Sequence, residues 1–71
     1  MTKSEQIIYN CGQDLYSKLE NKSSLTVEET EICEILDMNL ENFYEIEDDA
    51  DMVTECLCEV AEALERYNDL V

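Results

Sequence analysis

The sequence predicts a small all-α protein, a three- or four-helix bundle whose helices are joined by short loops. Its 71 residues suffice for a single domain, residues 1–71, with one modest core. The chain contains one glycine and no proline, so its composition favours long helices over tight turns and hairpins. Apolar residues make up 45% of the chain, which is normal for a globular protein and too high for a disordered acidic segment.

The first two helices are each expected to begin with a capping box, in which a Thr and a Glu three residues later satisfy each other's backbone N–H groups. Thr2 and Glu5 open a helix over residues 3–21, and Thr26 and Glu29 open the next one after a polar loop. Apolar side chains at helical spacing form the expected core stripe of the first helix: Ile8, Cys11, Leu15 and Leu19.

The second helix is expected over residues 27–38, and a short third helix over residues 40–46. We place a break near Met38-Asn39 because Asn39 is a weak helix former and a fair helix cap. A helix that continues unbroken to Tyr44 is the alternative, since one apolar face runs through both segments: Ile32, Cys33, Leu36, Leu40 and Phe43.

The last helix is expected over residues 49–70, after an acidic connector at residues 45–49. Either Asp48 or Asp49 caps it, because a negative charge suits the positive end of the helix dipole. This helix has the most regular amphipathic face in the chain: Val53, Cys56, Leu57, Val60, Leu64 and Tyr67.

The net negative charge of the chain comes from its last two-thirds. Residues 1–24 hold three acids and three lysines, whereas residues 25–71 hold sixteen acids and a single base, Arg66, within a net charge of −15. Nucleic acids and anionic membranes carry the same sign of charge, so both are disfavoured as direct partners. The expected partner is a basic, nucleic-acid-binding protein, because a strong field of one sign attracts surfaces of the other.

On a helical wheel, the acids fall into rows on the faces that point away from the core. One row follows the last helix, and we expect it to carry most of the partner binding: Asp51, Glu55, Glu62, Glu65 and Asp69. A further set lies on the second helix and the connector: Glu41, Glu45, Glu47, Asp48 and Asp49. Glu31 and Glu34 continue this further set toward the start of the second helix. An acidic helix face that does no more than contact solvent is the alternative interpretation.

Catalysis, a metal site and a bound cofactor are not expected. The chain has no His, no Gly-rich phosphate loop and no nucleophile with a plausible base. Cys11, Cys33 and Cys56 lie on apolar faces, where a free thiol packs as a small hydrophobe. Cys58 points the other way, into the acidic row, and we do not interpret it as a nucleophile. The acids near residue 48 lack the Gly of a calcium loop: a loop that starts at Asp48 would close with Glu59 but has Val53 at its sixth position, and one that starts at Glu47 would end at Cys58.

In size, charge and helicity the chain resembles the DNA-mimic inhibitors that phages encode, anti-CRISPR proteins in particular. The resemblance covers the acidic region from Glu28 to Asp69 and includes no family motif. It implies stoichiometric inhibition of a CRISPR effector or another defence nuclease, whose Lys- and Arg-lined groove the acidic surface occupies. The chain shows no signal-peptide pattern, and its longest apolar run is three residues, so we expect the cytoplasm of a bacterial host cell.

Two other functions remain open. A regulatory or antitoxin-like module would bind a basic partner without mimicry, through Tyr9 and Tyr16, which flank the core stripe of the first helix. The alternative for both tyrosines is packing within the core. A divalent-cation-binding protein is the other possibility. We expect a monomer rather than a dimer, because acidic faces repel one another.

Overall fold

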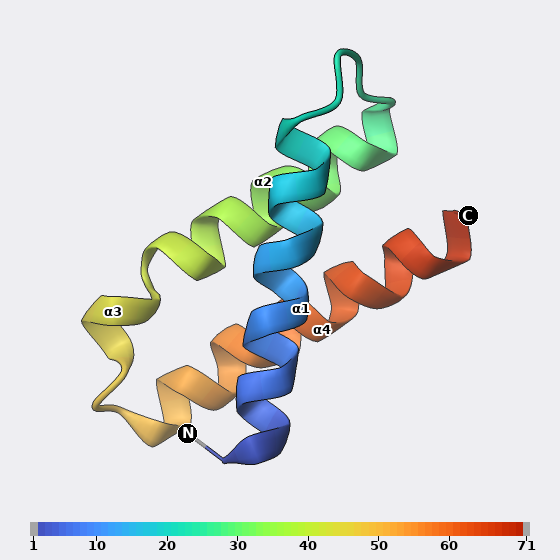
Figure 1. The fold of residues 1–71 in the computed structure, drawn as a ribbon. Helices are drawn as coiled ribbons and strands as arrows, with labels where there is room; N and C mark the ends of the chain where they lie inside the picture. Colours follow the sequence, from blue (N-terminus) through green and yellow to red (C-terminus); the bar gives the residue numbers. More distant parts are fainter. Residues whose placement is uncertain (1, 71) are drawn as a thin grey trace.

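The computed structural model describes residues 2–70 of the chain. It contains four helices in chain order, α1 (Lys3–Glu20), α2 (Val27–Glu41), α3 (Phe43–Ile46) and α4 (Ala50–Leu70), and no strand within the described residues (Figure 1). The predicted all-α bundle with short loops is therefore confirmed.

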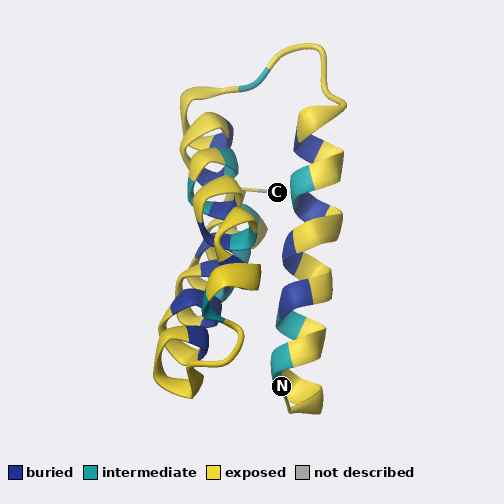
Figure 2. Cartoon of the chain, turned by 90° about the vertical axis from the view of Figure 1, so that its left-hand side faces the viewer, coloured by how far each residue is buried: buried dark blue, intermediate teal, exposed yellow. Residues whose placement is uncertain are grey.

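The three long helices pack against one another, and the short α3 packs against α2 and α4 at one end of the bundle. Figure 2 shows α1 standing beside the other helices, with the buried positions of both parts on the sides that face each other. The molecule is elongated, with extents of 36 × 21 × 15 Å. Exposed residues recur along the whole length of each of the three long helices.

The helix starts follow from local hydrogen bonds. In the first capping box, Glu5 N–H donates to Thr2 Oγ1 at 3.1 Å, and Thr2 N–H donates to Glu5 Oε1 at 2.8 Å. Thr26 and Glu29 form the same pair of bonds at the start of α2. At α4, Asp49 rather than Asp48 is the cap: its Oδ1 accepts from the N–H groups of the second and third residues that follow it, at 3.1 and 3.2 Å. Both predicted capping boxes are confirmed.

The buried face of α1 differs from the expected stripe. Cys11 is exposed, and the buried position beside it is Gly12, about 100° further round the helix at 3.6 residues per turn. A Cβ on Gly12 would lie 2.6 Å from Val60 Cγ1 of α4 and 3.7 Å from a methyl carbon of Leu36 in α2. Only a residue without a side chain permits this approach of three helices, so α1 turns Gly12 inward and Cys11 outward.

The break after α2 also lies elsewhere than predicted. The helix continues through Met38-Asn39 to Glu41, and the interruption falls at Asn42. Asn39 is buried, and its Nδ2 donates to the carbonyl of Ile35 at 2.8 Å, so the side chain is satisfied inside its own helix. An Asn that bonds its own helix in this way does not act as a cap.

The turn at Asn42 directs α3 into the core at the end of the bundle. Phe43 is buried, and its ring lies 4.6 Å from the ring of Tyr9, centroid to centroid. A second cluster of buried side chains fills the other end of the bundle, where α1, α2 and α4 meet: Leu15, Leu19, Ile32, Leu36, Val60 and Ala63. The core therefore has two parts, with Gly12 in the middle of the helix that spans both.

One ion pair joins the loop after α1 to the start of α2. Lys22 Nζ donates to Glu29 Oε2, while the other oxygen of the same carboxylate accepts from Thr26 N–H in the capping box. The bond from Lys22, together with the bonds from Thr26, lowers the pKa of Glu29, and the bond to Glu29 raises the pKa of Lys22. Glu29 is the one buried acid among the described residues, and its charge is paired.

Gly12→Ala should destabilise the protein, although Ala is the better helix former by about 1 kcal/mol. The added methyl meets the buried Val60 side chain at 2.6 Å, and such overpacking costs about 1–3 kcal/mol. Urea denaturation followed by circular dichroism measures the loss. In a Val60→Ala background the clash is removed, so the same Gly12→Ala change should cost much less. Additive effects of the two substitutions would contradict the proposed contact.

Glu29→Gln should remove stability only within a defined pH window. The pKa of Glu29 is lower in the folded chain, so its contribution is full above the ordinary Glu value of about 4.3 and disappears as the pH falls through the folded value. The pKa of Lys22 is raised in the folded chain, so that contribution is full below the ordinary Lys value of about 10.4 and disappears as the pH rises through the higher folded value. Denaturation at pH 7 and at pH 2.5 should therefore give a wild-type advantage that is larger at pH 7 and shrinks in acid. An equal difference at both pH values would exclude the ion pair as its cause.

Candidate protein-binding surface

The acidic side chains singled out from the sequence all lie on the surface. The row on α4 is exposed along its whole length: Asp51, Glu55, Glu62, Glu65 and Asp69. The second set is exposed as well, at the end of α2, on α3 and in the turn that leads to α4: Glu41, Glu45, Glu47, Asp48 and Asp49. Their carboxylates are thus available to a partner, except that one oxygen of Asp49 already caps α4.

Arg66, the single base of the acidic region, is already paired. Its Nη2 donates to Glu31 Oε2 at 2.9 Å, which links α4 to α2 across the surface. Both side chains are about half exposed, at 46% and 54%, and exposed pairs of this kind contribute about 0–1 kcal/mol. The bond neutralises one acid on this side of the bundle and leaves the α4 row without a counter-charge of its own.

The acidic side chains do not all lie on one face of the molecule. Glu41 lines a hollow between α1 and the α2–α3 segment, whereas Glu55 lines another hollow between that segment and α4. Glu59, which the sequence analysis did not single out, lies beside Glu55 in the second hollow. The acidic surface therefore continues round the two flanks of α2.

The linear charge density of the molecule approaches that of a nucleic acid. Dividing the 36 Å long axis by the 15 net charges gives 2.4 Å per charge. Duplex DNA carries one negative charge per about 1.7 Å of its axis, and a single strand one per about 3.4 Å. The value for this protein lies between the two.

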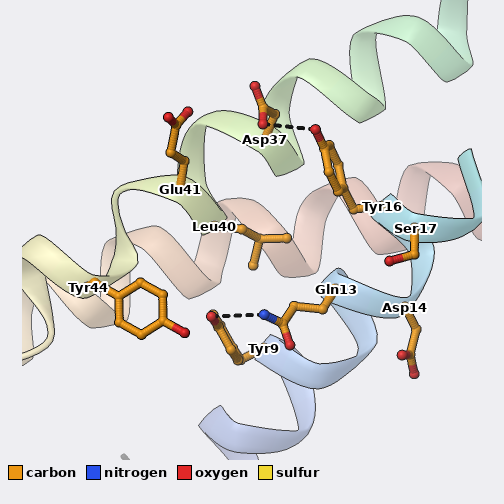
Figure 3. Close-up of a pocket in the computed structure, with 9 residues that line it drawn as sticks. All are labelled: Tyr9, Gln13, Asp14, Tyr16, Ser17, Asp37, Leu40, Glu41 and Tyr44. Atoms are coloured by element: carbon orange, nitrogen blue, oxygen red, sulfur yellow. Dashed lines mark hydrogen bonds between the residues drawn. The ribbon is translucent and has the colours of Figure 1, made fainter. Parts of the chain in front are cut away.

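The hollow between α1 and α2–α3, which we call the tyrosine hollow, has a volume of about 520 Å³ (Figure 3). Its lining comes from one side of α1 and from the end of α2 with α3: Tyr9, Gln13, Asp14, Tyr16, Ser17, Asp37, Leu40, Glu41 and Tyr44. Figure 3 shows the hydroxyl groups of Tyr9 and Tyr44 pointing toward each other across it. Tyr9 is buried, with 7% of its surface exposed, whereas Tyr44 is 72% exposed.

Hydrogen bonds fix the walls of the tyrosine hollow. Gln13 Nε2 donates to Tyr9 Oη at 3.0 Å within α1, and Tyr16 Oη donates to Asp37 Oδ1 at 3.0 Å across to α2. The bond to Asp37 holds the pKa of Tyr16 well above its ordinary value, and burial with the neighbouring Tyr44 raises the pKa of Tyr9. Both phenols stay protonated at neutral pH, so they act as hydrogen-bonding and aromatic groups.

Of the two tyrosines proposed as interface anchors, neither is freely exposed. Tyr9 packs on Phe43 in the core, and Tyr16 is half-buried with its hydroxyl engaged. The exposed aromatic ring is that of Tyr44, which was predicted to lie in the short helix over residues 40–46 and was given no role. The sequence did contain a signal that Tyr44 lies beside Asp37, Leu40 and Glu41. These four positions are three or four residues apart, so they fit one face of a continuous helix.

The four cysteines are free thiols that differ in burial. Cys56 is buried and its Sγ donates to the carbonyl of Asn39 at 3.2 Å, while burial raises the pKa of Cys56 and of the half-buried Cys33. Cys58 is exposed, as is Cys11. Within residues 2–70, no group of three or more His, Cys, Asp or Glu side chains is arranged to hold a metal ion. In the same range, no helix has the length and apolar character needed to cross a membrane.

Comparison with protein-family models, curated proteins and solved structures finds no match for this chain. A function for the surface therefore has to follow from its own charge and shape. The features available are the exposed acidic rows, the tyrosine hollow beside them and the hollow between α2 and α4.

Added salt should stabilise the folded protein. At an ionic strength of 0.01 M the screening length is about 30 Å, close to the 36 Å length of the molecule, so nearly all of its charges repel one another. At 0.15 M the length falls to about 8 Å, and only neighbours interact. Thermal unfolding followed by circular dichroism should give a midpoint that rises between these two conditions. A midpoint that falls would mean that attractive pairs, rather than net repulsion, dominate the electrostatics.

Proposed function

We propose that this protein is a stoichiometric inhibitor that occupies the Lys- and Arg-lined groove of a nucleic-acid-binding protein, and that its acidic surface takes the place of the nucleic acid. The observation that carries the proposal is the charge density of one net negative charge per 2.4 Å of length. The contact residues are the exposed acids of α4, from Asp51 to Asp69, with those of α3 and the turn before α4.

A basic protein partner accounts for features that folding alone does not favour. Glu residues three and four positions apart on α4 repel one another by about 0.2–0.5 kcal/mol per pair, and Lys at alternate positions would relieve this. No Lys lies in α4, and Arg66 bonds to Glu31 of α2. A surface that keeps its repulsion in the free state gains the most when a groove of opposite charge neutralises it.

The most suitable target class is a phage-defence nuclease complex such as a CRISPR effector. This part of the proposal draws on the similarity in size, charge and helicity to phage-encoded DNA mimics. An effector of this class holds nucleic acid in a positively charged channel and recognises it through its backbone. This protein is acidic and elongated, with a width of 15–21 Å, so it offers such a channel a negatively charged rod in place of the nucleic acid.

Competition with DNA tests the proposal directly. Fluorescence anisotropy of a labelled duplex, bound to purified CRISPR effectors and other DNA-binding nucleases, should fall as the protein is added, and less so as salt rises. Glu55→Lys with Glu62→Lys should weaken the competition by more than about tenfold, because like charges in an interface cost several kcal/mol. Circular dichroism should remain helical, since both side chains are exposed. Undiminished competition by this variant would sink the mimicry proposal.

A matched pair of single reversals controls for net charge. Glu62→Lys and Glu20→Lys change the charge of the protein equally, and both side chains are exposed on helices, but only Glu62 belongs to the α4 row. Mimicry through α4 requires a larger loss of competition for Glu62→Lys. Equal losses would indicate that only net charge matters.

A second candidate is a regulatory module that binds a basic partner mainly through apolar contacts. Exposed methionines favour it: Met38 and Met52 line the hollow between α2 and α4 and are 58% and 48% exposed. Under this function, binding would persist at high salt, and Met38→Ser with Met52→Ser would weaken it more than charge reversal does. The salt series of the competition assay separates the two candidates.

A further inference from the structure

We propose that the tyrosine hollow receives an arginine side chain of the partner, and so provides one specific contact within an otherwise diffuse acidic surface. The proposal rests on the proposed function, because it assumes the same basic partner. It adds the place on the molecule where a single basic residue is recognised and the chemistry of its recognition.

The hollow offers hydrogen-bond acceptors and no competing cation. Its rim carries the carboxylates of Asp14 on α1 and of Asp37 and Glu41 on α2, and no Lys or Arg lines it. Asp37 uses one oxygen to accept from Tyr16, and the Gln13 amide nitrogen donates to Tyr9, which leaves the amide oxygen of Gln13 as an acceptor. A guanidinium group has five N–H donors and no acceptor, so it suits the side of the lining that Asp37 and Glu41 form, which Figure 3 shows opposite Asp14.

The aromatic lining favours arginine over lysine. Tyr44 presents a largely exposed ring, and the half-buried Tyr16 lines the hollow as well. A planar guanidinium is weakly hydrated and stacks on such rings, whereas an ammonium group is compact and strongly hydrated. Leu40 gives the methylene stem of the arginine an apolar surface to cover.

A metal ion fits the hollow poorly. The carboxylates come from two helices on different sides of the rim, and among residues 2–70 no three acidic, Cys or His groups converge as metal ligands would. Calcium, for comparison, requires oxygen ligands at about 2.3–2.6 Å. The volume of about 520 Å³ lies within the range of roughly 300–1,000 Å³ for sites that accept organic ligands. An extended organic cation can reach acceptors that a single ion cannot bridge.

An NMR titration with blocked tripeptides tests the proposal. A Gly-Arg-Gly peptide at millimolar concentration should shift the amide signals of Gln13, Glu41 and Tyr44. The same peptide with citrulline, which has the shape of arginine without its charge, should leave them unmoved, and the lysine peptide should bind more weakly. Shifts spread along α4 instead, or equal binding of the citrulline peptide, would overturn the site. Equal binding of the lysine peptide would overturn the assignment to guanidinium.

A pair of charge-matched variants separates the hollow from the general field. Glu41→Gln and Glu62→Gln each remove one exposed carboxylate, but only Glu41 lines the hollow. Glu41→Gln should weaken binding of the arginine peptide by up to about fivefold, the upper end of the effect of an exposed ion pair, and Glu62→Gln should not. Equal weakening by both would leave only diffuse attraction and reject the site. Both variants should fold, because both side chains are exposed. Glu41 also lies at the C-terminal end of α2, where a negative charge is not favoured.

Tyr44→Leu provides a test that does not depend on charge. The side chain is largely exposed and lies outside the core clusters, so its replacement should leave the fold intact. Loss of arginine binding in this variant supports stacking on the ring, and unchanged binding rejects it.

The outcomes also separate this inference from the proposed function. If the arginine peptide does not bind the hollow while the protein still displaces DNA in a salt-dependent manner, only the inference fails. If the peptide binds the hollow and Glu41→Gln weakens it, but no nucleic-acid-binding protein is displaced from DNA, the mimicry fails and the arginine site stands.

Discussion

The close approach of three helices at Gly12 is the contact on which the rest of the structure depends. The space where a side chain would lie is filled by Val60 of α4 and, slightly further away, by Leu36 of α2. This contact fixes the rotation of α1 about its axis. With Gly12 inward, Tyr9 reaches Phe43 in the core, Tyr16 reaches Asp37 on α2, and Cys11 faces outward. The tyrosine hollow is therefore a consequence of how α1 is packed.

The fold tolerates its net charge of −15 because the acids lie where their burial and mutual repulsion cost little free energy. All but one of the acids in residues 2–70 lie outside the buried core, and the exception, Glu29, is bonded to Lys22 and to the start of its own helix. Acids in the first turn of α1, α2 and α4 also complement the helix dipoles. What remains is repulsion between exposed groups, which salt or a basic partner relieves.

The two candidate features of the surface meet at α2. Glu41 belongs to the acidic set singled out for binding and also forms part of the rim of the tyrosine hollow. A partner that covers the acidic surface at the end of α2 would thus reach the hollow without a change in the fold. The acidic rows would supply attraction over a distance, which accelerates association, and the hollow would supply a contact that depends on geometry. The two contributions differ in their dependence on salt, so they can be measured separately.

The sequence by itself determined the features that depend on near neighbours in the chain. Both capping boxes and the exposure of the acidic rows follow from spacings of three and four residues, and the structure contains them where they were predicted. The tertiary structure decided which side of α1 is buried and where α2 ends. Cys11 and Gly12 compete for the same interface, and only the shape of Val60 and Leu36 opposite selects the glycine. Asn39 has the character of a cap, yet burial against Cys56 keeps it inside the helix. Packing between distant segments made these choices, because local preferences differ by less energy than a well-filled core provides.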